Sequence, residues 1–306
     1  MADTYYELKL IINPSMEDLV SEIFFENFDC EGVILAEETY KDLEMTETTE
    51  GTLRIFLKNS GNETFEDLQY DIENVLDLYR HEFKERGLTD FELGSWEFVL
   101  EEKHNEDWSQ KWKEKWDITH VTDRVTVVPD WIDYNPQNPD EIIIKMEPGC
   151  AFGTGTHQTT QLCMKALEKY MKKGAKVADI GMGSGILSIL AMKFGASSVY
   201  GCDNDETVIE VAKENARKND VQCTFELGTA DKISDKFDFV VANILHFVLA
   251  EIMGDLKNIM KENALMSLSG ILDEKKQMVL DAIERENLQI VEEIHQDQWT
   301  SYVVKK

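Results

Sequence analysis

The chain has 306 residues, with 31 Lys and Arg against 60 Asp and Glu, a formal net charge of −29. This length predicts about two domains, and 42% hydrophobic residues are enough for packed cores, which excludes the disordered and fibrous classes. No apolar run approaches the ~18 residues of a membrane span, and the acidic start is unlike a signal peptide. The five cysteines form no C-x-x-C pair. We therefore expect a soluble, cytoplasmic protein with no disulfide framework, no metal site and no direct binding to nucleic acid or membrane. We also expect a monomer, although composition and charge do not determine the oligomeric state.

The acidic charge is concentrated in the first third of the chain. Residues 1–102 hold 7 Lys and Arg and 27 Asp and Glu, whereas residues 103–306 hold 24 and 33. One interpretation is a solvated acidic surface. The other is a docking face that steers a basic partner toward the protein.

The predicted elements of residues 1–102 alternate in the order βαββαβ. Apolar alternation predicts strands at 5–12, 32–35, 52–57 and 91–100, and helical periodicity predicts one helix after Ser15 and another over 64–86. This order is typical of a ferredoxin-like α+β domain. Because this domain contains no catalytic constellation, we interpret residues 1–102 as a substrate-recognition module.

A connector is predicted for residues 103–148. Trp108, Trp112 and Trp116 recur every four residues, which places three indoles on one helix face. They either pack against a neighbouring domain or contact a substrate. Four of the five prolines lie between Pro129 and Pro148, which indicates an ordered connection.

Residues 149–306 show the strand–helix alternation of a doubly wound, Rossmann-like α/β domain with a parallel sheet. Strands are predicted at 176–180, 198–203, 223–227, 237–242 and 264–269, and helices at 185–194, 206–218, 248–261 and 273–286. Two closing strands, 289–295 and 301–304, are expected to form an antiparallel hairpin at one edge.

A glycine-rich turn, D-I-G-M-G-S-G-I (Asp179–Ile186), follows the first of these strands and opens a helix. A dinucleotide fingerprint would need glycine at Ile186. The observed G-x-G-x-G spacing, preceded by an acidic residue, resembles instead the first motif of methyltransferases that use S-adenosyl-L-methionine, a nucleoside ligand with an amino-acid tail in place of a pyrophosphate. Asp203 ends the next strand, where its carboxylate can accept hydrogen bonds from ribose hydroxyls. Asp205 is a second acceptor or a helix cap, and Asp231 contacts an adenine or lies in a surface loop.

Asn243 ends the fourth strand, where ligands of open α/β sheets bind. Its amide can hold an amine with the lone pair aimed at a methyl donor. A glycine-rich segment at residues 147–160 is either a loop with a helix cap or a lid. In a lid, Phe152 would cover the ligand, Thr160 would lie near its polar tail, and His157 would face the substrate as a catalytic base.

Five segments occur in the order and spacing of a known family: A-F-G-T-G-T-H-Q-T-T (Ala151–Thr160), D-I-G-M-G-S-G-I-L (Asp179–Leu187), G-C-D-N-D (Gly201–Asp205), A-N-I-L (Ala242–Leu245) and L-S-G-I-L (Leu268–Leu272). Glu106–Trp112 and Gln298-Trp299 also match. The chain thus resembles the ribosomal protein L11 methyltransferase (PrmA) family of class I enzymes that use S-adenosyl-L-methionine (AdoMet).

The resemblance implies a protein N-methyltransferase that modifies the N-terminal α-amine and lysine ε-amines of ribosomal protein L11, a basic partner. It implies that the N-terminal domain holds the substrate and that the connector lets the catalytic domain reach different amines. Trp299 would lie at the substrate entrance. The implied AdoMet positions are Phe152, Thr160, Gly181, Gly183, Asp203 and Asn243.

The chain departs from the family pattern at three places. Met182 replaces a small residue between the first two glycines, His246-Phe247 replaces an Ala-Gly pair on the substrate side, and Lys261–Asn263 replaces a Pro-Gly-Gly turn. Two alternatives therefore stay open. The enzyme acts on another protein or a small amine, or the chain is a catalytically silent AdoMet-binding assembly factor, against which intact Asp203 and Asn243 argue.

Overall fold

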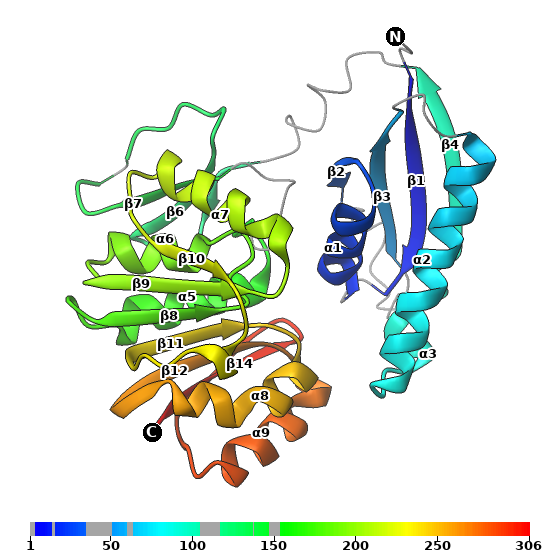
Figure 1. The fold of residues 1–306 in the computed structure, drawn as a ribbon. Helices are drawn as coiled ribbons and strands as arrows, with labels where there is room; N and C mark the ends of the chain where they lie inside the picture. The colour runs from blue at the N-terminus through cyan, green and yellow to red at the C-terminus, as the bar shows by residue number, and fades with distance from the viewer. Residues whose placement is uncertain are drawn as a thin grey trace, which may run out of the picture. The chain divides into compact units, whose positions relative to one another are not determined.

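The computed structural model describes residues 4–13, 16–34, 51–59, 64–104, 117–136, 138–146 and 154–306 (Figure 1). The chain divides into two compact units, Met1–Trp116 and Asp117–Lys306. None of the helices within the described ranges combines the length and hydropathy of a membrane-spanning segment. The tryptophans predicted to share a helix face, Trp108, Trp112 and Trp116, lie outside the described residues.

The first unit has the predicted βαββαβ order. Its described strands form an antiparallel sheet in the order β2-β3-β1-β4, with α1 and α2 on one face (Figure 1). This is the ferredoxin-like arrangement that the sequence predicted. The elements are β1 (Thr4–Ile12), α1 (Glu17–Asn27), β2 (Cys30–Ile34), β3 (Gly51–Lys58), α2 (Phe65–Glu85), α3 (Asp90–Leu93) and β4 (Phe98–His104).

The buried residues of this unit recur with the period of two typical of a strand and with the helical period of about 3.6. Alternate residues of β1 are buried, and α2 buries residues spaced by four and seven positions, as expected for one sheet face and one helix stripe. The buried side chains of α2 are Leu68, Ile72, Leu76 and Phe83.

The prediction of a strand over residues 91–100 is wrong for its first half. Asp90–Leu93 is a helical turn, because the Thr89 side chain accepts from the Glu92 amide while Glu92 Oε2 accepts from the Thr89 amide at 2.7 Å. This reciprocal capping box outweighs the apolar alternation. The strand begins only at Phe98.

The second unit contains a sheet in the order β10-β9-β8-β11-β12-β14-β13. Its first five strands are parallel, and β14 and β13 are antiparallel, which confirms the doubly wound fold and the predicted hairpin at one edge. The strands are β8 (Lys176–Ile180), β9 (Ser198–Asp203), β10 (Thr224–Leu227), β11 (Phe237–Asn243), β12 (Met260–Leu272), β13 (Gln289–Gln296) and β14 (Trp299–Lys305).

Helices cover both faces of this sheet, and each face has its own core (Figure 1). One core contains residues of α5, α6 and α7, and the other contains residues of α8 and α9. The described helices are α5 (Gln158–Tyr170), α6 (Ile186–Lys193), α7 (Glu206–Lys218), η3 (Ala230–Lys232), α8 (His246–Asn258), η4 (Asp273–Lys275) and α9 (Lys276–Arg285). The chain order reverses between β8 and β11, so the carboxyl ends of these two strands mark the topological switch point where ligands bind.

A small sheet that the sequence analysis did not predict lies within the second unit. It consists of β5 (Thr119–His120), β6 (Val125–Pro129) and β7 (Ile142–Met146), in the order β5-β6-β7. All residues of β6 are buried, and Asn219, the C-cap residue of α7, bonds to both the amide and the carbonyl of Lys145. The second half of the predicted connector is therefore packed on the core of the second unit.

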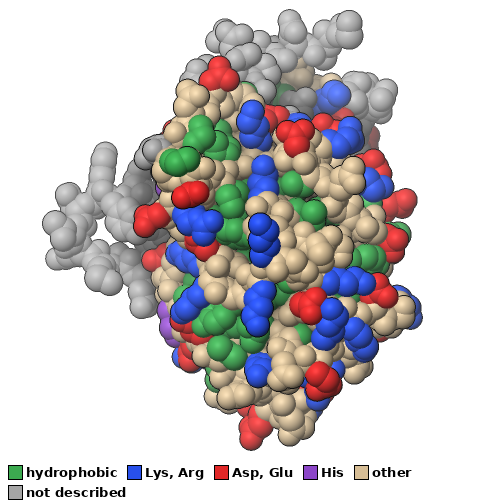
Figure 2. All heavy atoms as spheres, turned by 90° about the vertical axis from the view of Figure 1, so that its left-hand side faces the viewer, with side chains coloured by type: hydrophobic (Ala, Val, Ile, Leu, Met, Phe, Trp, Pro, Cys, Tyr) green, Lys and Arg blue, Asp and Glu red, His purple; other side chains and the backbone are tan. Residues whose placement is uncertain are grey.

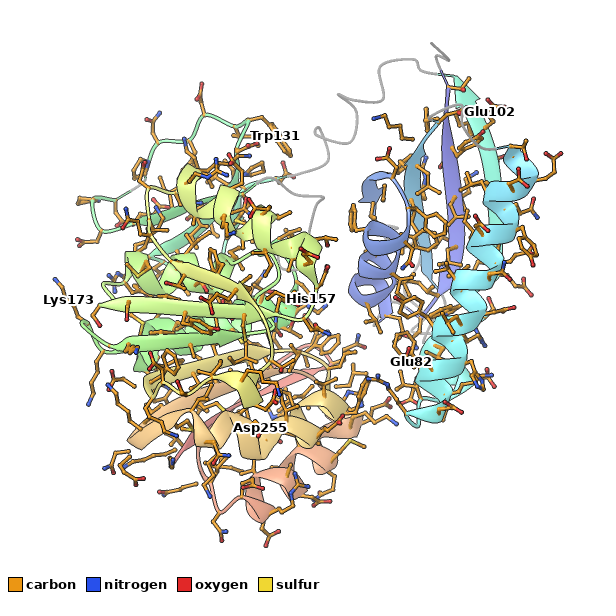
Figure 3. The ribbon with its side chains drawn as sticks, viewed as in Figure 1. Glu82, Glu102, Trp131, His157, Lys173 and Asp255 are labelled. Atoms are coloured by element: carbon orange, nitrogen blue, oxygen red, sulfur yellow. The ribbon has the colours of Figure 1, made fainter. Side chains whose placement is uncertain are left out.

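The surface of the second unit carries both signs of charge. Figure 3 labels Lys173 just before the start of β8, at the opposite end of the strand from His157. The side of the molecule that includes this end of the sheet shows a column of Lys and Arg side chains with Asp and Glu among them (Figure 2). This mixture agrees with the smaller acidic excess of residues 103–306.

Candidate active site at the sheet switch point

The glycine-rich turn between β8 and α6 has a backbone that only glycine adopts readily. Gly181, Gly183 and Gly185 have φ values of +69°, +49° and +76°, all in the left-handed region. The amides of Gly181 and Met182 both donate to the Cys202 carbonyl, at 2.9 and 3.2 Å. The turn is thereby fixed against the end of β9.

Gly181 also lies against the end of β11. A Cβ at this position would be 2.3 Å from Cγ2 of Ile244, the residue that follows Asn243. The absence of a side chain therefore lets the turn and the Asn243 strand end approach each other closely.

Asp203 is brought to the same turn from β9. Its Oδ2 accepts from the Gly183 amide at 2.9 Å, and its Oδ1 accepts from the Asp205 amide at 3.2 Å. Burial raises the pKa of Asp203, and these amide donors oppose that rise. Asp205 caps α7 through the Thr207 amide at 2.7 Å, which supports the cap interpretation of this residue.

Asn243 meets Thr160 of α5 in the buried interior of the site. Asn243 Nδ2 donates to Thr160 Oγ1 at 3.3 Å, and both residues are buried. Asn243 Oδ1 and Asp179 Oδ1 are buried and have no hydrogen-bond partner among the residues that the structure describes. Buried unsatisfied acceptors are costly, so this pair indicates a ligand that brings N–H or O–H donors.

Asp179 is the titratable one of these two acceptors. Burial raises its pKa to about 7, the negative charge of Asp203 adds to the rise, and two hydrogen bonds from Ser188 oppose it. A cationic ligand would favour the ionised form of this carboxylate.

We expect this carboxyl to make the stability of the protein depend on pH. Asp179 loses its proton near pH 4 in the unfolded chain and near pH 7 in the folded protein. Between these values the folded protein binds the extra proton, so the free energy of unfolding falls as the pH rises from about 4 to about 7. Denaturant unfolding of wild type and Asp179→Asn at pH 5 and pH 8 tests this. The interval from pH 5 to pH 8 covers about two thirds of the range between these pKa values, so the substitution should remove about 3 kcal/mol of that decline. Identical pH profiles of the two proteins would contradict the assignment.

His157 and Trp299 form a second part of the site. The His157 side chain caps α5 by accepting from the Thr159 amide at 3.3 Å, and Thr159 Oγ1 lies 2.7 Å from the same Nδ1. The His157 and Trp299 rings meet edge to face, with centroids 5.0 Å apart. Because Nδ1 accepts the hydrogen bond from the Thr159 amide, the neutral ring carries its proton on Nε2.

Gly270 and Ser269, which lie in the L-S-G-I-L segment, also contact the strand end and the helix that form the site. Gly270 has a φ of +86°, and a Cβ there would be 2.3 Å from the Ile244 carbonyl oxygen. Ser269 Oγ donates to the Thr159 carbonyl at 3.0 Å. A glycine inside a strand is the feature that could have identified this close backbone approach.

The structure describes seven of the eight predicted site residues. It joins Gly183 to Asp203, Thr160 to Asn243 and His157 to Trp299, and it places Gly181 against Ile244. Phe152 lies outside the described residues. The bulky pair His246 and Phe247 is buried at the start of α8, with ring centroids 5.5 Å apart.

Comparisons with known proteins show the family of this chain. The family model described as "Ribosomal protein L11 methyltransferase (PrmA)" matches residues 4–306. The chain is similar to the ribosomal protein L11 methyltransferase of Ruminiclostridium cellulolyticum, with 34% identity over 98% of each chain. It is also similar to the enzyme of that name from Bacillus licheniformis, with 37% identity over 80% of this chain and 76% of that protein. A crystal structure of a ribosomal protein L11 methylase from Lactobacillus delbrueckii subsp. bulgaricus is 34% identical, with a TM-score of 0.59 over 62% of this chain and 98% of that one. The chain therefore belongs to the ribosomal protein L11 methyltransferase (PrmA) family of AdoMet-dependent enzymes.

Proposed function

We propose that this protein transfers methyl groups from AdoMet to the N-terminal α-amine and lysine ε-amines of ribosomal protein L11, acting as a monomer in the cytoplasm. Its relatives named as ribosomal protein L11 methyltransferases support this substrate. The observation that carries the chemistry is the buried, unpartnered Asn243 Oδ1 at the sheet switch point.

The residues of the switch point fit AdoMet. The orphaned Asp179 Oδ1 suits a ligand with a cationic N–H donor, and the glycine turn provides the close backbone approach. Asp203 would accept from the ribose hydroxyls, and Gly181, Gly183, Thr160 and Phe152 would hold the rest of the ligand. When bound, AdoMet supplies an electrophilic methyl group on a sulfonium.

Asn243 positions the substrate amine in this proposal. A nucleophilic amine needs a free lone pair, so its N–H groups must be held by acceptors that direct the lone pair toward the methyl group. Thr160 accepts from Asn243 Nδ2, which fixes the orientation of the amide and leaves Oδ1 as the acceptor.

His157 acts through position in this proposal, because its Nδ1 already serves the helix cap. The His157 ring packs against the Trp299 ring, and the two side chains together line the substrate side of the site. We expect His157→Asn to retain most of the wild-type kcat, since asparagine is also a good N-cap, and His157→Ala to destabilise the protein by about 1 kcal/mol. If kcat falls equally and strongly in both variants, measured beside their thermal unfolding, His157 is the catalytic base instead.

Labelled AdoMet and a panel of purified ribosomal proteins test the substrate. We expect label on L11, and less label when its N-terminal amine is blocked beforehand, with the remainder on lysines. Label on another protein, or on small amines alone, would replace the substrate claim. No transfer to any acceptor despite AdoMet binding would support a catalytically silent binding factor.

A further inference from the structure

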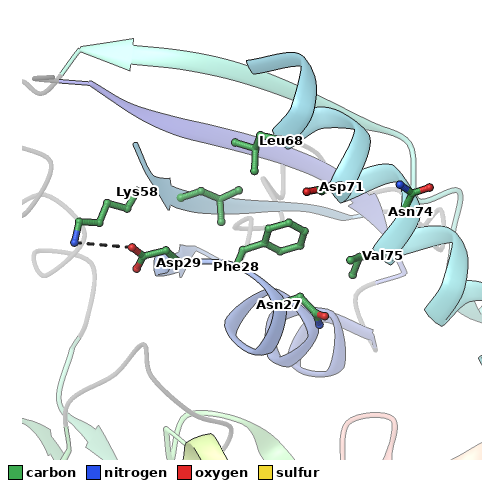
Figure 4. Close-up of a pocket in the computed structure, with 9 residues that line it drawn as sticks. Asn27, Phe28, Asp29, Lys58, Leu68, Asp71, Asn74 and Val75 are labelled. Atoms are coloured by element: carbon green, nitrogen blue, oxygen red, sulfur yellow. Dashed lines mark ion pairs between the residues drawn. The ribbon is translucent and has the colours of Figure 1, made fainter. Parts of the chain in front are cut away.

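A cavity outside the active site lies in the first unit, between the end of α1 and the middle of α2 (Figure 4). Its volume is about 340 Å³, which is within the ~300–1,000 Å³ range of ligand pockets. The lining residues come from the α1–β2 turn, the end of β3 and α2: Asn27, Phe28, Asp29, Leu57, Lys58, Leu68, Asp71, Asn74 and Val75.

The lining combines an apolar floor with a polar, acidic rim. Leu57 and Leu68 are buried, whereas Asp29 and Asp71 are exposed. The apolar surface also continues beyond the cavity: Leu78 follows Asp71 by seven residues on the same side of α2 and is 63% exposed. A large exposed aliphatic side chain beside a cavity is typical of a contact surface.

The charge balance of the rim favours a cationic occupant. Lys58 is the cation in the lining, and it lies 3.9 Å from Asp29 with both side chains more than half exposed, so this pair is weak. Asp71 has no ion-pair partner among the described residues. The surrounding residues 1–102 hold 27 Asp and Glu against 7 Lys and Arg, so the field of the unit attracts positive charge.

We infer that this cavity is a docking pocket for a basic side chain, lysine or arginine, of the protein substrate. The apolar floor suits the methylene stem of such a side chain, and the Asp29 and Asp71 carboxylates receive its charged head. The exposed Leu78 supplies a contact for an apolar neighbour in the bound segment. This inference rests on the proposed function, because it takes L11 as the protein that is captured.

The test compares two double variants of the full-length protein that remove the same charge from the same unit. Asp29→Asn with Asp71→Asn changes the pocket, whereas Glu73→Gln with Asp77→Asn changes exposed positions on the opposite side of α2. Binding of fluorescently labelled L11 is measured by anisotropy at 50 mM salt, and methylation of L11 and binding of AdoMet are measured in parallel. We expect the pocket variant to raise Kd and KM for L11 about tenfold with kcat and AdoMet affinity unchanged, and the control variant to raise them less than twofold.

The outcomes separate the two claims. Equal effects of both double variants would mean that only the overall field matters, and no effect of the pocket variant would mean that the pocket is not used; either result overturns the docking inference. A wild-type protein that binds L11 through Asp29 and Asp71 but does not methylate it overturns the proposed function and supports the docking inference. A wild-type protein that does not bind L11 overturns both.

Discussion

Replacement of Asn243 by alanine is expected to lower kcat for methyl transfer about 100-fold while AdoMet affinity changes only a few-fold. The expected size is that of losing one preorganised hydrogen-bonding group at a reacting centre. In the wild-type protein the buried Oδ1 has no partner among the described residues and Nδ2 is held by Thr160, so the amide is fixed before the substrate arrives. Single-turnover methylation of L11 and calorimetric titration with AdoMet measure the two quantities separately.

Asn219 provides a matched control for this substitution. It is also a buried asparagine of the second unit, but its side chain bonds to the backbone of Lys145 and Asn215 and serves the packing of β7 on α7. Asn219→Ala should cost roughly 1–3 kcal/mol of stability and leave kcat close to wild type below its unfolding temperature. An Asn243→Ala protein with wild-type kcat would contradict the proposed role of the amide.

The sequence predicted the fold best where one periodicity was uninterrupted. The strands at 176–180 and 198–203 and the helix at 206–218 agree with the structure residue for residue. The spacing of 20 residues between Gly183 and Asp203 corresponds to a direct hydrogen bond, because adjacent parallel strands carry their ends to the same edge of the sheet.

The errors have local physical causes. The short runs Val125–Pro129 and Ile142–Met146 lie among prolines, and each has four apolar residues and one polar residue. So short an apolar run cannot distinguish a buried strand from a connection. At residues 90–93 the apolar pattern competed with a capping box, and the two reciprocal hydrogen bonds of Thr89 and Glu92 prevailed. The T-x-x-E spacing of Thr89 and Glu92 is the signal in the sequence that indicates this helical turn.

The packing within the site could not be predicted from spacing. Gly181 and Gly270 both approach Ile244, one at its side chain and the other at its carbonyl, from strands that are far apart in the sequence. Pattern analysis identifies each glycine, but only the register of β8, β11 and β12 shows that all three segments converge on the residue after Asn243.

Gly181→Ala is expected to weaken AdoMet binding at least tenfold, which corresponds to about 1.4 kcal/mol. The substitution should raise the free energy of the folded protein in two ways. A residue with a Cβ is strained in the left-handed backbone conformation, and the added Cβ would clash with Ile244 Cγ2 at 2.3 Å. Gly174→Ala isolates the first of these effects, because Gly174 has a φ of +83° and nothing within 4 Å of a Cβ. Both variants should lose about 1–2 kcal/mol of stability from the backbone, and only Gly181→Ala should also lose AdoMet affinity.

A second substitution separates the clash from the backbone strain at Gly181 itself. Ile244→Ala removes the Cγ2 methyl and keeps Cβ, which lies at an ordinary contact distance of 3.8 Å from the added atom. If displacement of Ile244, and with it Asn243, causes the loss, then Gly181→Ala with Ile244→Ala should bind AdoMet more tightly than Gly181→Ala alone. The coupling energy from the four proteins of this cycle measures the contact, because the two positions touch directly. Additive losses of affinity would show that the turn binds AdoMet through its own backbone geometry and that its contact with the β11 end is incidental.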